Sequence, residues 1–275
     1  MLHEMKKLEN YKISATDGEI GQVKDFYFDD DKWTVRYLVV EAGTWLSSRK
    51  VLISPISVLA PDWLAHTLAV SITMAQVKSS PDIDTDKPVS RQNEEQYIGY
   101  YGHPAYWGGG GIWGEGLYPY AMSPGYAGYV GDPIEREREL EAHRAHERAR
   151  HRNDDPHLRS CNDVSGHHIQ ATDGEIGHVA GFIVDDQTWA IRYLIIDTSN
   201  WWLGNKVLVA PHWITGINWS EETVSVDLSR EFIKNAPAYN ANTELTRDQE
   251  LSLYRHYGRR GYWAGGAPPD SDGKI

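Results

Sequence analysis

The sequence predicts a mainly β protein, with two small β-barrels related by internal duplication, short helices and a charged linker helix. The first reason is that residues 13–55 align without a gap with residues 169–211, and 21 of the 43 aligned positions are identical. The second is that each repeat contains five or six short stretches in which apolar residues recur at about every second position. Such stretches, separated by polar turns within about 75 residues, are typical of a small barrel.

The start of each repeat is marked by turn residues. An Asp-Gly pair begins at Asp17 and again at Asp173, where glycine permits the positive φ of a tight turn. An acidic turn at residues 29–32 then separates two strands, and Trp33 begins the alternation of the second strand. Trp189 stands at the same point of the other repeat. We therefore expect both tryptophans to be mostly buried barrel residues.

Prolines and capping residues set the limits of the later elements. Pro55 and Pro211 each follow an apolar stretch, and proline suits the end of a strand because it cannot donate to the ladder. Thr73 and Thr246 each stand three residues before a glutamine, which is the pattern of a capping box, and Ser229 can cap another helix. The predicted strands are 50–53, 68–72, 206–209 and 224–228, and the predicted helices are 91–101, 230–234 and 247–256.

Five consecutive parts result from this division. They are a first barrel at residues 1–84, a short helix with a Gly/Tyr/Trp-rich segment at 85–131, a charged linker helix at 132–156, a second barrel at 157–240, and a helix with a Gly/aromatic tail at 241–275. The aromatic segment 99–131 is expected to lack regular structure and either packs on a barrel or a partner, or serves as a flexible linker. The helix Pro133–Arg152 has acidic residues at its start and basic residues at its end, as the helix dipole favours. It carries few apolar residues, so we expect an exposed spacer.

Composition narrows the class of protein. The formal net charge is −12, whereas binding to nucleic-acid backbones needs clustered positive charge, so nucleic acid is not an expected partner. A single cysteine, Cys161, excludes an intrachain disulfide. No run of about 18 apolar residues predicts a transmembrane segment. We expect a cytoplasmic protein without a membrane span.

Catalytic and metal sites are not indicated. The nucleophile motif GxSxG is absent, and Cys161 has no local signature of a catalytic thiol. His143, Glu147 and His151 follow one another at four-residue spacing, which places them on one face of a helix, as a zinc site requires. The arginines around them would repel a divalent cation, so a solvated charged face is the favoured interpretation and these three remain weak candidates for a metal site. No cofactor and no enzymatic activity are expected.

Large apolar residues in loops are the best candidates for a binding surface. Loops that expose aromatic groups often mark contacts, although such a loop can also fold over the end of its own barrel. The candidate interaction residues are Trp45, Leu46, Tyr106, Trp107, Trp201, Trp202, Leu203, Tyr262 and Trp263.

Three matching stretches carry a resemblance to a known family. They are DGEIGQVKDFYFD and DGEIGHVAGFIVD, then WTVRYLVVE and WAIRYLIID, then KVLISP and KVLVAP. In order and spacing they resemble the PRC-barrel family, over roughly 75 residues of each half. The resemblance implies a six-stranded β-barrel that acts as an interaction module and brings no catalytic residues. The family includes the cytoplasmic domain of the photosynthetic reaction-centre H subunit, the C-terminal domain of a ribosome-maturation factor and many stand-alone bacterial proteins.

The expected function is that of a non-enzymatic adaptor built from two PRC-barrels, which binds another protein or associates with itself, for example as a homodimer. One alternative is an accessory of the reaction-centre H-subunit type, in electron transfer at a membrane complex, which would require an anchor or a membrane-bound partner. Another alternative is an RNA-processing or ribosome-assembly factor, against which the net charge argues.

Overall fold

The computed structural model describes residues 1–81, 89, 91–107, 110–114, 116–122, 158–198 and 205–264. Its residues form two compact units, each described here by itself. The first unit comprises Met1–Gly166 and Ala180–Leu194, and the second comprises His167–Val179 and Ile195–Ile275. The predicted linker helix Pro133–Arg152 lies outside the described residues.

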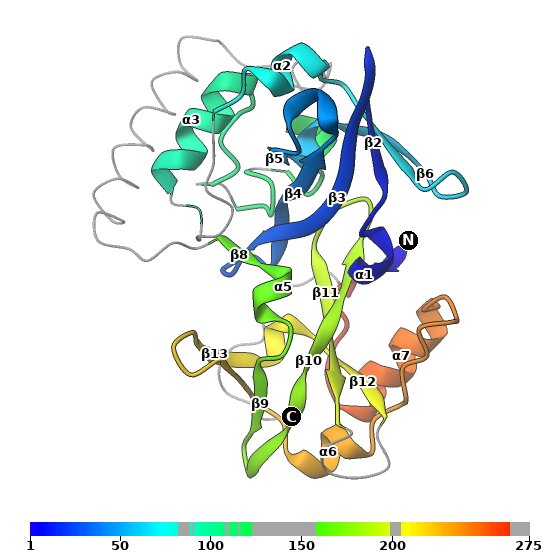
Figure 1. Ribbon diagram of the computed structural model, residues 1–275. Coiled ribbons are helices and arrows are strands. Elements are labelled where there is room, and N and C mark those ends of the chain that lie inside the picture. Colours follow the sequence, from blue (N-terminus) through cyan, green and yellow to red (C-terminus); the bar gives the residue numbers. More distant parts are fainter. Residues whose placement is uncertain are drawn as a thin grey trace. The chain divides into compact units, whose positions relative to one another are not determined.

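The first sheet follows the strand order β5-β4-β3-β2-β7-β6. Its strands are β2 (Lys12–Ala15), β3 (Gly18–Asp29), β4 (Thr34–Ala42), β5 (Lys50–Ile53), β6 (Val58–Asp62) and β7 (Thr67–Val70). β2 and β7 run parallel, and the other neighbours run antiparallel. Fully buried side chains such as Ile13, Val23 and Val40 form its core. Figure 1 shows β3 as the long strand of this sheet and the hairpin of β6 and β7 extending from it.

The second sheet has the order β12-β11-β10-β9-β14-β13, so strands at corresponding chain positions occupy corresponding places in the two sheets. Its strands are β9 (His168–Ala171), β10 (Gly174–Asp185), β11 (Ile191–Asp197), β12 (Lys206–Val209), β13 (Ile214–Asn218) and β14 (Thr223–Val226). In this sheet β14 and β9 run parallel, as β7 and β2 do in the first, whereas β10 with β9 and β13 with β14 run antiparallel. Among the described strands, no pairing of the two outermost strands closes either sheet into a barrel.

Each sheet has one further short strand, which comes from the other half of the chain. Neither strand was predicted from the sequence. β1 (Leu2–Glu4) pairs with β10, with Leu2 opposite Asp185, and β8 (Leu158–Ser160) pairs with β3, with Leu158 opposite Asp29. A one-turn helix follows each of them, α1 (Met5–Leu8) and α5 (Cys161–Val164). All of these pairings lie within the first compact unit. They also explain why that unit includes Ala180–Leu194, because residues far apart in the chain build one core.

The capping residues predict the helices correctly. α2 (Met74–Lys78), α3 (Arg91–Tyr101), α6 (Arg230–Lys234) and α7 (Arg247–His256) form where expected. Thr73 and Thr246 each complete a capping box, and the hydroxyl of Ser229 accepts from the Phe232 N–H. The strand-ending prolines Pro55 and Pro211 open short 3₁₀ helices, η2 (Pro55–Ser57) and η4 (Pro211–Trp213). Two further 3₁₀ helices are η1 (Thr44–Leu46) and η3 (Pro119–Met122).

The two turn tryptophans depart from the expected strand pattern. Trp33 and Trp189 have φ values of 49° and 57°, so both are left-handed turn residues rather than the first residues of a strand. Trp189 is buried, with 4% of its surface exposed, as predicted. Trp33 is half-buried, so it is less buried than the mostly buried position that was expected. The left-handed backbone conformation of the turn sets the direction of each tryptophan ring. The alternation of apolar and polar residues along a strand does not predict this conformation.

Candidate functional site

The Trp45 loop folds back on its own sheet. Trp45 lies on η1, is half-buried, and donates a hydrogen bond from Nε1 to the carbonyl oxygen of Ile20 at 2.8 Å. Leu46 beside it is also half-buried. Of the two interpretations of this loop, the structure favours a loop that covers its own sheet. The corresponding candidates Trp201, Trp202 and Leu203 lie outside the described residues.

Tyr106 belongs to an aromatic cage around a buried arginine. Arg36 is 1% exposed, and its Nη2 pairs with Asp29 Oδ2 at 3.1 Å. Its Nη1 donates to the carbonyl oxygen of Ile112 at 2.6 Å, and its guanidinium carbon lies 3.9 Å from the Tyr106 ring centre and 4.7 Å from the ring of Trp113. The aromatic segment therefore supplies core residues of the first unit, since cation–π contacts and a buried ion pair hold it there.

This burial corrects the placement of Tyr106 on an exposed contact surface. Only 4% of Tyr106 is exposed, and its hydroxyl donates to the buried carboxylate of Glu94. Trp107 is half-buried and packs edge-on against Tyr106, with ring centres 5.0 Å apart. The sequence indicated the aromatic character of the segment but not Arg36, the charged residue that orders it.

Tyr262 and Trp263 pack on helix α7 of the second unit. The Arg247 guanidinium carbon lies 4.1 Å from the Trp263 ring centre, and the Tyr262 hydroxyl donates to Glu250 Oε1 at 3.0 Å. Trp263 also meets Tyr254 edge-on, with ring centres 5.0 Å apart. Both candidates are half-buried, so their contacts within the unit use part of the surface assigned to a partner.

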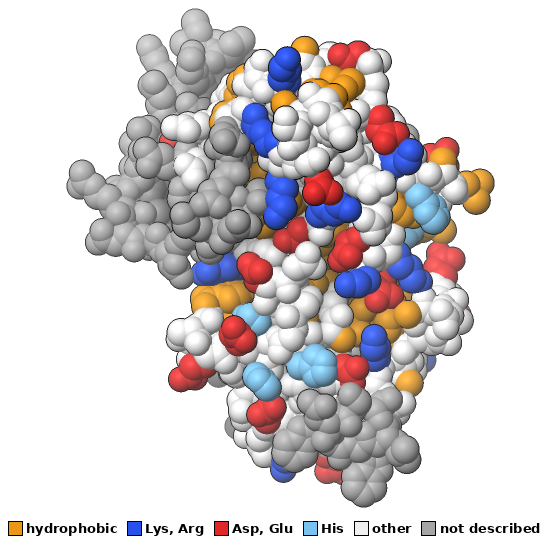
Figure 2. Space-filling model, in the orientation of Figure 1, with side chains coloured by type: hydrophobic (Ala, Val, Ile, Leu, Met, Phe, Trp, Pro, Cys, Tyr) orange, Lys and Arg blue, Asp and Glu red, His pale blue; other side chains and the backbone are white. Residues whose placement is uncertain are grey.

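Among the described residues, the most exposed large apolar side chain lies elsewhere, at the end of the β6–β7 hairpin. We call residues 59–66 the hairpin tip. Leu64 is 98% exposed and Leu59 is 65% exposed. Asp62 Oδ1 accepts from the N–H groups of Leu64 and Ala65 at 3.1 and 2.9 Å, which fixes the turn. Figure 2 shows hydrophobic side chains at the end of this hairpin with a histidine beside them.

Stacked rings hold the hairpin tip in place. Trp63 stacks on His3, with ring centres 3.9 Å apart and 15° between the planes. His66 stacks on Tyr11 with ring centres 4.9 Å apart and 4° between the planes. The exposed leucines thus project from a fixed base. Sequence reasoning missed this site, although the available signal was Trp63-Leu64 within a turn, where polar residues are usual.

Burial shifts the pKa values of several groups in the first unit. Burial raises the pKa of Asp25 to about 6, against the hydrogen bonds that its carboxylate accepts from Ser160, Phe26 and Asn162. Burial lowers the pKa of His103 to about 4. Burial also raises the pKa of the Cys161 thiol well above its ordinary value, which makes a reactive thiolate unfavourable.

Metal ligands are not clustered in the part of the chain that the structure describes. It contains no group of three or more His, Cys, Asp or Glu side chains placed to hold an ion. The weak metal candidates His143, Glu147 and His151 lie outside it. None of the described helices combines the length and the apolar character that a transmembrane span requires.

Comparison with known families agrees with the resemblance seen in the sequence. Residues 3–63 match the family model of the PRC-barrel domain. The match runs from β1 through β6 and ends inside the hairpin tip. A search of curated proteins finds no match to this chain. The predicted resemblance to the PRC-barrel family is therefore confirmed for residues 3–63.

Proposed function

We propose that this chain is a non-enzymatic protein-interaction module, built from two PRC-type barrels related by internal duplication. The duplication is supported by the matching strand orders of the two sheets and by the aligned repeats. The PRC-barrel match of residues 3–63 supports an interaction role, because membership of this family implies a barrel that acts as an interaction module.

The hairpin tip is the contact surface in this proposal. The observation that carries it is the 98% exposure of Leu64 on a turn that Asp62 and two ring stacks hold fixed. Burying a leucine side chain stabilises a contact by about 1.5–3 kcal/mol, so a partner that covers Leu64 and Leu59 gains that energy without having to order a loop. The occupant is a protein, either another chain or a second copy of this one.

The test compares leucine-to-serine variants at exposed positions inside and outside the hairpin tip. Leu59→Ser with Leu64→Ser removes the apolar tip, whereas Leu117→Ser replaces an exposed leucine (58%) outside it. We expect the wild type and Leu117→Ser to retain the same co-purifying protein at native expression, or the same self-association by light scattering. The tip variant should lose it. Identical partners and identical masses for all three proteins would contradict the proposal.

A further inference from the structure

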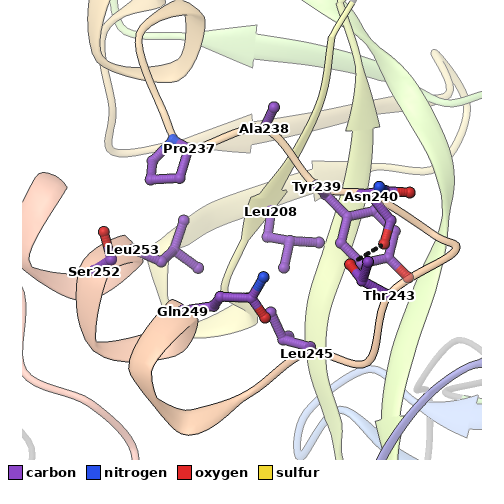
Figure 3. A pocket seen from close by; sticks show the side chains of 10 residues that line it. All are labelled: Leu208, Pro237, Ala238, Tyr239, Asn240, Thr243, Leu245, Gln249, Ser252 and Leu253. Carbon is purple, nitrogen blue, oxygen red and sulfur yellow. Dashed lines mark hydrogen bonds between the residues drawn. The ribbon is translucent and has the colours of Figure 1, made fainter.

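The second unit contains a pocket of about 150 Å³ between β12, α7 and the loop that joins α6 to α7. Leu208, Leu245 and Leu253 supply its apolar part, and Asn240, Thr243 and Ser252 bring polar groups to its rim. Figure 3 shows Gln249 among the three leucines, with Ser252 to the left and Asn240 and Thr243 to the right. Leu208 and Leu253 are each only 3% exposed, so they form a floor below a mouth of exposed residues.

In the first unit the corresponding helix position carries a buried ring. Position 253 corresponds to Tyr97 at the repeat offset of 156, and α3 begins at the position that corresponds to the start of α7. Tyr97 is 1% exposed and packs in one buried cluster with Leu52 and Val89, which correspond to Leu208 and Leu245. The same three positions therefore form a packed cluster around a phenol ring in one unit and border an open pocket in the other.

The tyrosine one turn further along the helix has a ring neighbour in both units. Tyr101 on α3 has the Tyr97 ring as its neighbour, with ring centres 4.8 Å apart. Tyr257 on α7 is 6% exposed and has the Trp213 ring as its neighbour, with ring centres 4.7 Å apart. The second unit therefore takes this ring from η4, while its residue 253 is a leucine.

We propose that the pocket is a binding site for one free phenol ring, which takes the place that Tyr97 fills in the first unit. A cavity of about 150 Å³ has room for a single aromatic ring, and apolar floors of this kind bind such rings. The rim groups Asn240, Thr243 and Ser252 can exchange hydrogen bonds with the phenol hydroxyl. The ligand in this proposal is a small phenol rather than a tyrosine residue of a peptide, and the titration compares the two.

The experiment is a titration of the full chain with p-cresol, which is the side chain of tyrosine as a free molecule, followed by amide NMR shifts. We expect saturable shifts at residues 237–253 with a dissociation constant of about 1 mM, the range for a ligand of one ring. Leu253→Tyr should weaken binding at least tenfold, because the new ring occupies the pocket as Tyr97 does. Ser252→Phe, which covers the mouth from an exposed position, should do the same if Leu253→Tyr fails to fold.

Two controls decide between explanations. Arg255→Phe adds a ring at an exposed position of α7 away from the pocket and should leave p-cresol binding unchanged. N-acetyl-tyrosinamide should bind more weakly than p-cresol, and 4-methylcyclohexanol, which lacks the aromatic ring, should also bind more weakly. The proposal is overturned if p-cresol shifts no amide of the pocket, if both pocket variants bind it as the wild type does, or if either of the two other compounds binds more tightly.

Discussion

Replacing Asp25 by asparagine should raise the free energy of unfolding at pH 7. The Asp25 carboxylate stands at a bulge of β3, where Ser160 donates to Oδ2 at 2.5 Å and the Phe26 N–H donates to Oδ1 at 2.7 Å. Its Oδ1 also accepts from the Asn162 N–H at the start of α5, at 3.2 Å. These bonds favour the charged form, yet burial outweighs them and raises the pKa of Asp25 from 3.8 to about 6.

The magnitude and sign follow from that pKa difference. A rise from 3.8 to about 6 corresponds to about 3 kcal/mol, which the ionised Asp25 costs the folded state at pH 7. The folded protein takes up a proton near pH 6 and the unfolded chain only near pH 3.8, so this cost disappears as the pH falls through that window. The uncharged amide of the asparagine variant would avoid the cost at every pH. We therefore expect Asp25→Asn to gain up to about 3 kcal/mol at pH 7 and nothing below pH 3.8.

Urea unfolding of both proteins between about pH 4 and pH 8 measures the difference. Ser160→Ala is the companion variant, because it removes a hydrogen bond that lowers the pKa of Asp25. In that variant, proton uptake should move to a higher pH. The reasoning is refuted if Asp25→Asn is less stable than the wild type at pH 7 and remains so at pH 5, because the charged carboxylate would then stabilise the fold.

Three further variants test the first unit. Arg36→Ala should lower the free energy of unfolding, measured in urea, by about 3–5 kcal/mol, because Asp29 would stay buried without its ion pair. Arg192→Ala should cause a smaller loss, because the Arg192 side chain is 20% exposed. Equal losses in the two variants would contradict the role of burial. Trp189→Ala should cost about 3–5 kcal/mol, and an unchanged thermal midpoint would show that its ring is not a core contact. His103→Gln should abolish a loss of stability that the wild type shows on acidification. Burial lowers the pKa of His103 from 6.5 to about 4, so the folded state favours the neutral ring. The contribution of this ring to the free energy of unfolding is complete above pH 6.5 and falls as the pH drops through this window. Parallel pH profiles of His103→Gln and the wild type would refute it.

Local signals predicted the elements whose ends are marked by particular residues. Thr246 and Gln249 mark the start of α7, and the alternation before Pro55 marks β5, because caps and strand ends depend on residues a few positions away. The short strands β1 and β8 could not be predicted in this way. A strand of three residues is too short to show an alternation of apolar and polar residues. The strand that pairs with β1 or with β8 also lies far away along the chain.

The candidate site was predicted less well than the fold. Aromatic residues were taken as contact groups because loops were expected to expose them, but Tyr106 is held by Arg36, a strand residue far away in sequence. Whether an aromatic side chain is buried depends on such tertiary contacts, which composition does not encode. The exposure of Leu64 follows from the length of the β6–β7 hairpin, again a property of the folded chain rather than of its local pattern.

The differences between the repeats carry more functional information than their identities. Identical positions such as Arg36 and Arg192 preserve an ion pair to a turn aspartate in both halves, so they report on what the fold requires. Where the residues differ, the packing of the two halves differs as well. Tyr97 fills the space that Leu253 leaves as a pocket, and a fold that is stable in both forms is free to use the open one for a ligand. By the same logic the functional differences between the halves should lie at the substituted positions, and exchanging residues 97 and 253 should move the phenol site to the other unit.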